Sequence, residues 1–446
     1  MASKITIIGG GSATFTPQLM RLFLESEVLR GSTIVLMDVD AHRLEVMDTL
    51  AKQLVDMKGS DLKIESTTDQ QESLVDADFV ITAIAVGGAD AYEVDIETPA
   101  KYGIFMHVCD SLGPGGIMRG LRHIPVLVSV CQDLEEVSPH ALVFNYTNPL
   151  SAITLAMQQE VTSIKTVGLC TCSSIPYHAK YLAGLAGLDP DDLVLPAPAA
   201  GLNHCAAILR LPLKDGGDAL PLLKERVTEP VTKWGLETYG VLPYCSGHWT
   251  EFFPSLCRLE EEYQGKLQGL KMKYGMKVFD MEDPECPGAR ARGRKWEQVV
   301  EGWISGKQGK GKSLEMLPSD ESVQVVALME ALLENRNEVH VVNIPNQGAI
   351  GNLPDNAIVE VSAVVGGFGV NPIHVGNLPE NLAATIHNHI AVQELMVEAA
   401  LTGDRRVALR AFLQEPQIAS VLTPEETQRL LDEMLEAHAG YLPQFG

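Results

Sequence analysis

The sequence has no hydrophobic run that approaches the roughly 20 residues needed to cross a bilayer. It also lacks the long apolar stretch and small-residue cleavage site of a signal peptide, because residues 1–4 lead straight into a short apolar segment and then into glycines. We therefore expect no membrane partner and a cytoplasmic location.

Positive charge is scarce. The 34 Lys and Arg residues face 58 Asp and Glu residues, and the formal net charge is -24. Binding to a nucleic-acid backbone needs clustered cations that displace counterions, so we expect no nucleic-acid partner. With 446 residues and 46% hydrophobic content, the chain can bury a large core and is long enough for two lobes.

Cysteine is also sparse for a chain of this length. Eight cysteines are scattered along the sequence and form no framework of the kind that small secreted proteins use. Five of them are expected to be small buried hydrophobic residues: Cys109, Cys131, Cys205, Cys257 and Cys286. Cys170 and Cys172 differ, because they follow a predicted strand.

The first forty residues predict a dinucleotide site. A β-branched run at 5–8 is followed by GGGSAT at 9–14, which supplies the first two glycines of the dinucleotide fingerprint and Thr14 at the third position. An amphipathic helix over 17–24 would hold phosphates at its N-terminus. A second strand, 33–37, ends in Asp38, which favours NAD because a carboxylate binds ribose hydroxyls and repels a 2'-phosphate. Arg43 keeps NADP open as the alternative.

Further strands are predicted at 79–86, 141–144 and 166–169, alternating with helices. This alternation indicates an α/β fold with a doubly wound parallel Rossmann sheet, whose carboxyl edge would carry Asn145, Asn148 and Cys170. Turn and cap chemistry is the alternative reading of either asparagine. We place a Rossmann domain at 1–195 and a C-terminal α+β domain at 196–446, with helices over 321–333 and 381–401.

Cys170 and His204 are candidate metal ligands that lie 34 positions apart. Structural zinc sites use four ligands in closely spaced pairs, so this spacing is no zinc signature, and two unrelated buried residues remain the alternative. Cys172 and Cys205 are disfavoured as further ligands, because neighbours on extended chain should point away from the first pair.

Several segments, in this order and spacing, together resemble glycoside hydrolase family 4. They are GGGS at 9–12, DSLGPGGIMRGLRHIP at 110–125, NYTNP at 145–149, GLC at 168–170, GLNH at 201–204 and VNIPNQGAI at 342–350. The resemblance implies a glycosidase that depends on NAD and on a divalent metal, usually Mn²⁺, with a fold like that of lactate and malate dehydrogenases. It also implies a homodimer or homotetramer.

In this family, NAD oxidises C3 of the sugar, the C2 proton is removed, the aglycone leaves by elimination, water adds and C3 is reduced again. Thiolate and imidazole ligands would suit manganese, iron, cobalt or nickel better than magnesium. The resemblance implies that Cys170 and His204 bind the metal and that Asp110 assists proton transfer at the leaving group. Tyr244 is the expected base, with a lowered pKa near the metal, and Tyr239 is its alternative.

The resemblance also implies contacts with substrate and cofactor. Substrate contacts are expected from Asn148, Asn203 and His248, although His248 could instead cap a helix. Cofactor contacts are expected from Gly9, Gly11, Ser12, Ala13, Thr14, Phe15, Asp38, Arg43, Val86 and Asn145.

Two departures from the family pattern bear on the substrate. After Cys170 the sequence reads Thr171-Cys172-Ser173, where many members have His, Asp or Asn next to the cysteine. Members that cleave 6-phospho sugars have an arginine after the glycines that match Gly87 and Gly88, but here ADAYEVD follows at 89–95. Acidic residues repel phosphate, so we expect a non-phosphorylated glycoside as in the α-galactosidase, α-glucosidase and α-glucuronidase or galacturonidase branches. β- or thioglycosides are compatible with elimination.

One motif points elsewhere. GKQGKGKS at 306–313 fits the phosphate-loop pattern, but it follows a helical segment at 299–304 rather than a strand, so a solvated basic loop is expected. Two other functions remain open on the sequence. They are an NAD-dependent hydroxy-acid or sugar dehydrogenase and a catalytically silent sensor of NAD and sugar.

Overall fold

The structure, a computed structural model, describes residues 2–281, 289–305 and 323–446. Its strands are β1 (Lys4–Ile8), β2 (Thr33–Met37), β3 (Lys63–Thr67), β4 (Phe79–Thr82), β5 (Leu142–Asn145), β6 (Lys165–Gly168), β7 (Ala199–Leu202), β8 (Cys205–Ile208), β9 (Leu242–Pro243), β10 (Glu338–Pro345), β11 (Ile358–Gly366) and β12 (Gly369–Pro372).

Helices make up most of the rest of the described residues. The α-helices are α1 (Phe15–Glu25), α2 (Ala41–Lys58), α3 (Gln70–Leu74), α4 (Gly88–Lys101), α5 (Gly113–Val137), α6 (Leu150–Glu160), α7 (Ala179–Ala186), α8 (Leu220–Arg226), α9 (Pro230–Tyr239), α10 (Ser246–Glu251), α11 (Ala289–Ile304), α13 (Val323–Glu334), α14 (Glu380–Thr402), α15 (Arg405–Gln414), α16 (Pro416–Ala419) and α17 (Pro424–Ala437). Short 3-10 helices are η1 (Thr171–Tyr177), η2 (Pro190–Asp192), η3 (Ala439–Tyr441) and η4 (Pro443–Phe445).

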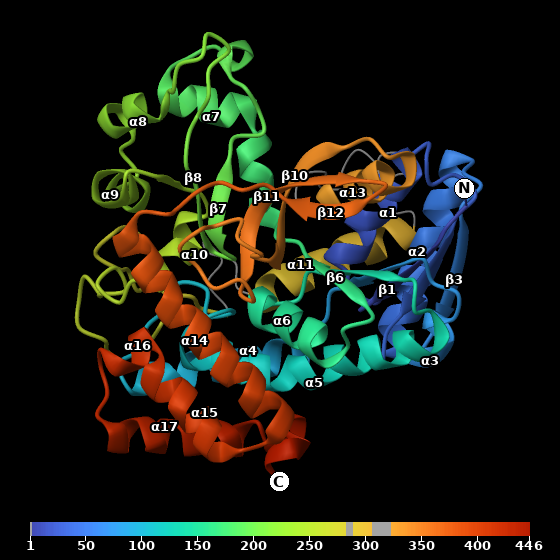
Figure 1. Cartoon of the computed structure of the whole chain (residues 1–446). Coiled ribbons are helices and arrows are strands. Elements are labelled where there is room, and N and C mark those ends of the chain that lie inside the picture. The colour runs from blue at the N-terminus through green and yellow to red at the C-terminus, as the bar shows by residue number, and fades with distance from the viewer. Residues whose placement is uncertain (1, 282–288, 306–322) are drawn as a thin grey trace.

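Six parallel strands form the N-terminal part of the sheet in the order β3-β2-β1-β4-β5-β6. This order is that of a dinucleotide-binding fold. Helices α1 and α2 pack together on one side of the strands, and α3, α5 and α6 pack together on the other, as Figure 1 shows. The predicted doubly wound Rossmann sheet is confirmed.

Two strand predictions were wrong in detail. The predicted strand 79–86 ends at Thr82, because residues 83–87 leave the ladder and their main chain turns to face the other site loops. The strand β3 was not predicted, because its KIEST sequence is largely solvent-facing and lacks an apolar run. The strand predicted at 141–144 is observed as β5.

The sheet continues into the C-terminal half. β10 runs antiparallel beside β6, where Asn343 pairs with Gly168, and β11, β7, β8 and β9 follow. The C-terminal half therefore has the predicted mixture of strands and long helices while sharing one sheet with the first half. The division at 195 and 196 stays a prediction.

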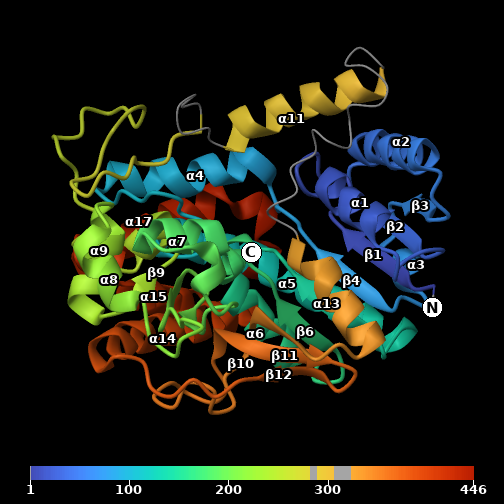
Figure 2. The same cartoon turned by 90° about the horizontal axis from the view of Figure 1, so that it is seen from above.

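The long helix α14 crosses α5 and α6 and packs on α15. Figures 1 and 2 show α14 running over the lower part of the molecule beside the C-terminal helices. Gly120 of α5 permits the close crossing, because a Cβ there would overlap the Met396 side chain of α14. The helices predicted at 321–333 and 381–401 are observed as α13 and α14, the first of them from Val323 onward in the described residues.

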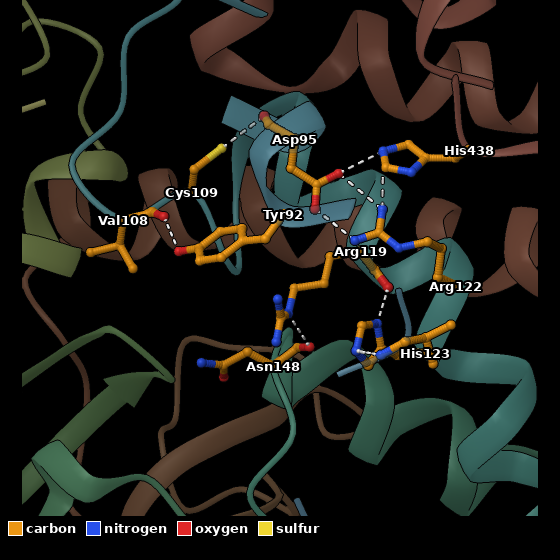
Figure 3. Close-up of polar contacts among 10 residues, drawn as sticks. Tyr92, Asp95, Val108, Cys109, Arg119, Arg122, His123, Asn148 and His438 are labelled. Carbon is orange, nitrogen blue, oxygen red and sulfur yellow. Dashed lines mark hydrogen bonds and ion pairs between the residues drawn. The ribbon is translucent and has the colours of Figure 1, made fainter. Parts of the chain in front are cut away.

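A buried ion pair ties α4, α5 and the end of α17 together (Figure 3). Arg122 donates to both carboxylate oxygens of Asp95 at 2.9 and 2.6 Å, and His438 Nε2 lies 2.9 Å from the same carboxylate. Burying a charge is tolerated only when it is paired. The pair fixes α5, whose first turn borders the candidate site.

No helix among the described residues combines the length and the apolar character required to span a bilayer. The GKQGKGKS motif at 306–313 lies outside the described residues.

Candidate active site

The predicted dinucleotide loop is a tight turn between β1 and α1. Gly9 has a φ of +97°, and a Cβ on it would overlap the Ala83 carbonyl oxygen. The Gly11 amide donates to Asp38 Oδ2 at 2.9 Å, so the end of β2 and the turn hold each other. Ser12 Oγ accepts from the Phe15 amide at 3.1 Å and starts α1. The loop thus has the close main-chain approach that a pyrophosphate needs.

Arg43 is paired with acidic side chains rather than free to bind a 2'-phosphate. Its guanidinium lies 3.5 Å from Asp40 and 3.3 Å from Glu297 of α11, both carboxylates. Asp38 meanwhile accepts from the Asp40 amide at 3.0 Å and stays at the strand end. These contacts favour NAD over NADP at this edge.

Asn145 anchors the loop after β5. Its side-chain oxygen accepts from Thr82 at 2.9 Å and from the Thr147 amide at 2.8 Å, while its amide nitrogen donates to Thr154 Oγ1 at 3.3 Å. The residue is fully buried. These internal bonds account for Asn145 without a ligand, and its predicted contact with a cofactor stays a prediction.

Val86 is held against α5. His123 Nε2 accepts from the Val86 amide at 3.1 Å, and His123 Nδ1 lies 2.6 Å from the Arg119 carbonyl oxygen. The Nδ1 nitrogen must therefore carry the proton. Burial, followed by the Arg119 charge, lowers the pKa of His123 well below its usual value, so the ring stays neutral.

Asp110 lies at the centre of a polar cluster just before α5. Asn148 Nδ2 and Ser111 Oγ each donate to its carboxylate at 2.8 Å, and His248 Nε2 is 3.9 Å away. Burial acts to raise the pKa of Asp110, but the neighbouring His248, His204 and Arg119 lower it by more. The carboxylate is therefore ionised at neutral pH.

Arg119 was not predicted as a site residue. Its Nε donates to the Asn148 carbonyl oxygen at 3.1 Å, and its guanidinium lies 5.3 Å from the centre of the Tyr92 ring (Figure 3). It is one of the charges that lower the pKa of Asp110. The sequence does show arginines on the helix that follows Asp110. The segment GGIMRGLR does not predict which of them faces the site.

Cys170 and His204 meet although 34 positions separate them. Cys170 follows β6, and His204 stands in the turn between β7 and β8, with its side chain within hydrogen-bonding reach of the Cys170 thiol. Ser111 Oγ gives its proton to Asp110, so His204 Nδ1, 3.2 Å away, must donate to Ser111. His204 Nε2 is left as a lone-pair donor. A thiol and a free imidazole nitrogen fit a transition-metal cation.

One expectation about the neighbouring cysteines was wrong. Cys172 does not point away from Cys170, and its side chain lies within hydrogen-bonding reach of both Cys170 and Cys245. Residues two positions apart share a face of extended chain, so the expectation had no basis in strand geometry. Cys205 is fully buried in the hydrophobic core, as expected.

His248 lies on α10 with its ring against that of His204, at a centroid distance of 3.8 Å. Ligand atoms of Asp110, His204 and His248 all lie within 4.8 Å of one another. The predicted substrate residue thus belongs to the same cluster as the predicted metal ligand.

Tyr244 binds a buried carboxylate that sequence reasoning missed. Its hydroxyl donates to Glu360 Oε1 at 2.6 Å, while Asn203 and Asn343 donate to Glu360 Oε2 at 3.0 and 2.9 Å. The side-chain oxygens of both asparagines are buried without a partner among the described residues. Glu360 lies within the β-branched strand β11, where an isolated acid gives no sign of what it will face.

The expected lowering of the Tyr244 pKa by a metal stays a prediction, and the protein's own groups act in the opposite direction. Burial first and the Glu360 carboxylate second raise the pKa of Tyr244 well above its usual value. The phenol is therefore a neutral donor to Glu360. Tyr239, the alternative base, packs against Trp234, Trp249 and Phe253, so the structure places it in an aromatic cluster.

Glu251, at the end of α10, is a second buried acid that the sequence did not reveal. It accepts from the amides of Val108 and Cys109 at 2.6 and 2.9 Å and so fixes the main chain that leads to Asp110. Burial raises the pKa of Glu251 to about 7.

The comparisons with known proteins cover both halves of this site. The sequence matches the description "Family 4 glycosyl hydrolase" over residues 4–177 and "Family 4 glycosyl hydrolase C-terminal domain" over residues 199–418. The chain belongs to family 4 of the glycosyl hydrolases. Family membership makes it a glycosidase rather than a hydroxy-acid dehydrogenase.

Relatives with known names span nearly the whole chain. The alpha-galactosidase of Bacillus subtilis (strain 168) is 30% identical over 99% of this chain and 99% of its own length. A protein of the same organism named "Probable 6-phospho-beta-glucosidase" is 32% identical over 99% and 98%. Family-4 relatives named for both neutral and phosphorylated sugars are thus similar to the chain.

Solved structures show the fold. A 6-phospho-alpha-glucosidase from gut microorganisms, solved with NAD and Mn²⁺, matches with a TM-score of 0.81, 22% identity and 100% of both chains. Malate dehydrogenase from Plasmodium falciparum, solved with NADH, matches with a TM-score of 0.50 and 12% identity over 90% of this chain and 98% of its own. The predicted dehydrogenase-like fold of this family-4 chain is confirmed.

Proposed function

We propose that the protein hydrolyses non-phosphorylated glycosides with the help of bound NAD and a divalent transition metal such as Mn²⁺. The observation that carries the proposal is the meeting of Cys170, His204 and Asp110 at the edge of a dinucleotide-binding sheet. An NAD-binding fold alone would not need a pair of soft metal ligands. The chemistry proposed here, at a sugar carbon that bears oxygen, uses both NAD and a metal cation.

The residues present fit both NAD and a divalent cation. The turn at 9–15, Asp38 and Val86 would hold NAD, and Cys170 with the free Nε2 of His204 would hold the cation. When bound, NAD accepts and returns a hydride at C3 of the sugar, and the cation polarises the adjacent oxygens.

Tyr244 and Glu360 would remove the C2 proton together. The phenol already donates its proton toward Glu360 at 2.6 Å, so transfer of that proton to the carboxylate leaves the Tyr244 oxygen free to accept the proton from carbon. Asn203, held on the same carboxylate, keeps an unpartnered side-chain oxygen for a sugar hydroxyl.

Asp110 and His248 would assist the leaving group. Asp110 is ionised, so it cannot donate a proton itself at neutral pH. A proton on His248 Nε2, 3.9 Å from that carboxylate, can pass to the leaving oxygen, with Asp110 orienting the ring. Asn148, bound to Asp110 at 2.8 Å, orients a hydroxyl beside it.

The non-phosphorylated substrate is argued from the segment at 89–95. It begins α4, beside the Gly87 and Gly88 turn, and contributes Asp90 and Glu93 rather than an arginine. Asp90 lies in the first helical turn, and its charge disfavours a second anion there. A homodimer or homotetramer and a cytoplasmic location stay predictions.

The test is a panel of nitrophenyl glycosides: neutral hexosides, uronides and 6-phosphohexosides, each as α- and β-anomers. We expect aglycone release from a neutral hexoside or a uronide that needs both NAD and Mn²⁺ and exceeds the rate on the matching 6-phosphohexoside. Faster cleavage of the phosphorylated partner would contradict the substrate class, and release without NAD would contradict the reaction.

A further inference from the structure

A second set of soft ligands lies beside the proposed catalytic cation site. The ligand atoms of Cys172, Cys245 and His248 all lie within 4.8 Å of one another. Cys245 Sγ is 2.7 Å from His248 Nδ1, and the Cys172 thiol is within hydrogen-bonding reach of Cys245. None of the three is fully buried, so an ion from solvent can reach them.

The set is assembled from two distant parts of the chain. Cys172 lies at the start of η1, and Cys245-Ser246-Gly247-His248 supplies a closely spaced pair at the start of α10. A Cys and a His with two residues between them have a spacing that zinc sites use. Two thiolates and an imidazole select a soft or borderline cation over Mg²⁺ or Ca²⁺.

The orientation of His248 supports ligation through Nδ1. This nitrogen faces Cys245, whereas Nε2 faces the Asp110 carboxylate at 3.9 Å. A histidine that binds a metal through one nitrogen commonly directs the other toward a carboxylate, which fixes the tautomer. The carboxylate and the histidine of such an arrangement are therefore already in place.

We propose that Cys172, Cys245 and His248 form a second cation site, specific for Zn²⁺ or a similarly soft divalent ion and separate from the Cys170 and His204 pair. Binding releases the two thiol protons and leaves a fourth position open. Cys170, within hydrogen-bonding reach of Cys172, stays with the catalytic site.

Cd²⁺ titration of the full-length protein tests the proposal, because each cadmium-bound thiolate adds to an ultraviolet charge-transfer band. The background is Cys170→Ser, which removes the sulfur of the catalytic site. We expect the band to persist there, and Cys172→Ser or Cys245→Ser in the same background to lower Cd²⁺ affinity at least about tenfold. The matched control is Cys131→Ala, which removes a buried thiol of α5 outside the cluster and should change nothing.

A second measurement needs no variant. Zn²⁺ should protect Cys172 and Cys245 of the native protein from alkylation, read out by peptide mass spectrometry. Loss of the whole cadmium band in Cys170→Ser, or equal alkylation with and without Zn²⁺, would overturn the second site. Neither readout involves glycoside cleavage, so the proposed function stands or falls separately.

Discussion

The contact between Tyr244 and Glu360 makes a prediction at the scale of single residues. Tyr244→Phe removes the oxygen that would accept the C2 proton, so kcat should fall by about 100-fold or more. It also takes one donor from the buried Glu360 carboxylate, which should lower the free energy of unfolding by about 1–3 kcal/mol. The measurements are steady-state kinetics with NAD and Mn²⁺ and denaturant unfolding.

Tyr239→Phe is the matched control, because Tyr239 packs among Trp234, Trp249 and Phe253. It should retain the activity of the native protein. Loss of activity in Tyr239→Phe with none in Tyr244→Phe would reverse the assignment of the base.

The raised pKa of Glu251 leads to a prediction of how the stability of the protein depends on pH. Burial raises the pKa of Glu251 from the usual 4.5 to about 7, so between these values the folded protein keeps a proton that the unfolded chain has lost. The free energy of unfolding should therefore fall as pH rises from about 4.5 to about 7, by on the order of 3 kcal/mol from this group.

Glu251→Gln should remove that part of the pH dependence and keep an oxygen for the Val108 and Cys109 amides. Because burial also raises the pKa of Glu415 to about 7, the quantity to measure is the difference in unfolding free energy between native and variant protein. A difference that stays constant from pH 4.5 to 7 would show that Glu251 does not titrate in this way.

At the scale of elements, the first turn of α5 positions the cluster around Asp110. A Cβ on Gly116 would overlap the main-chain carbonyl of Ser111, whose side chain joins Asp110 to His204. Gly116→Ala should therefore displace this main chain, lower activity and cost about 1–3 kcal/mol of stability. Kinetics and thermal unfolding measure the two effects.

Gly184→Ala is the matched control for that substitution. Gly184 lies within α7, and nothing stands within 4 Å of a Cβ added there. Helix propensity should raise its stability by roughly 0.5–1 kcal/mol and leave activity unchanged. If Gly116→Ala behaved like this control, α5 would not hold the Asp110 loop in the way described.

At the scale of the whole molecule, the sequence predicted what local patterns determine. Apolar runs bounded by glycines located β1, β2 and β4, and the strand ends carried Asp38, Asn148 and Cys170 to one edge. The exposed strand β3 was not predicted, because a solvent-facing edge strand has no apolar run.

The site residues that the sequence did not predict were missed for another reason. Each of them acts through contacts with residues more than 25 positions away, as Glu251, Glu360 and Arg119 show. In the sequence each is only a single acid or base, of the kind that any protein surface also carries. Cys172 was misplaced because residues two positions apart on extended chain share a face, which the expectation overlooked. Only the folded chain reveals which partner each of these side chains meets.

The central claim is that the glycosidic bond is cleaved after a proton leaves C2, with Tyr244 and Glu360 as its acceptors. Hydrolysis in D2O tests it directly, because a sugar that loses this proton regains hydrogen from solvent when water adds. Mass spectrometry and proton NMR of the released sugar should find deuterium on C2. Full release of a sugar that carries only its original hydrogen on C2 would contradict the account.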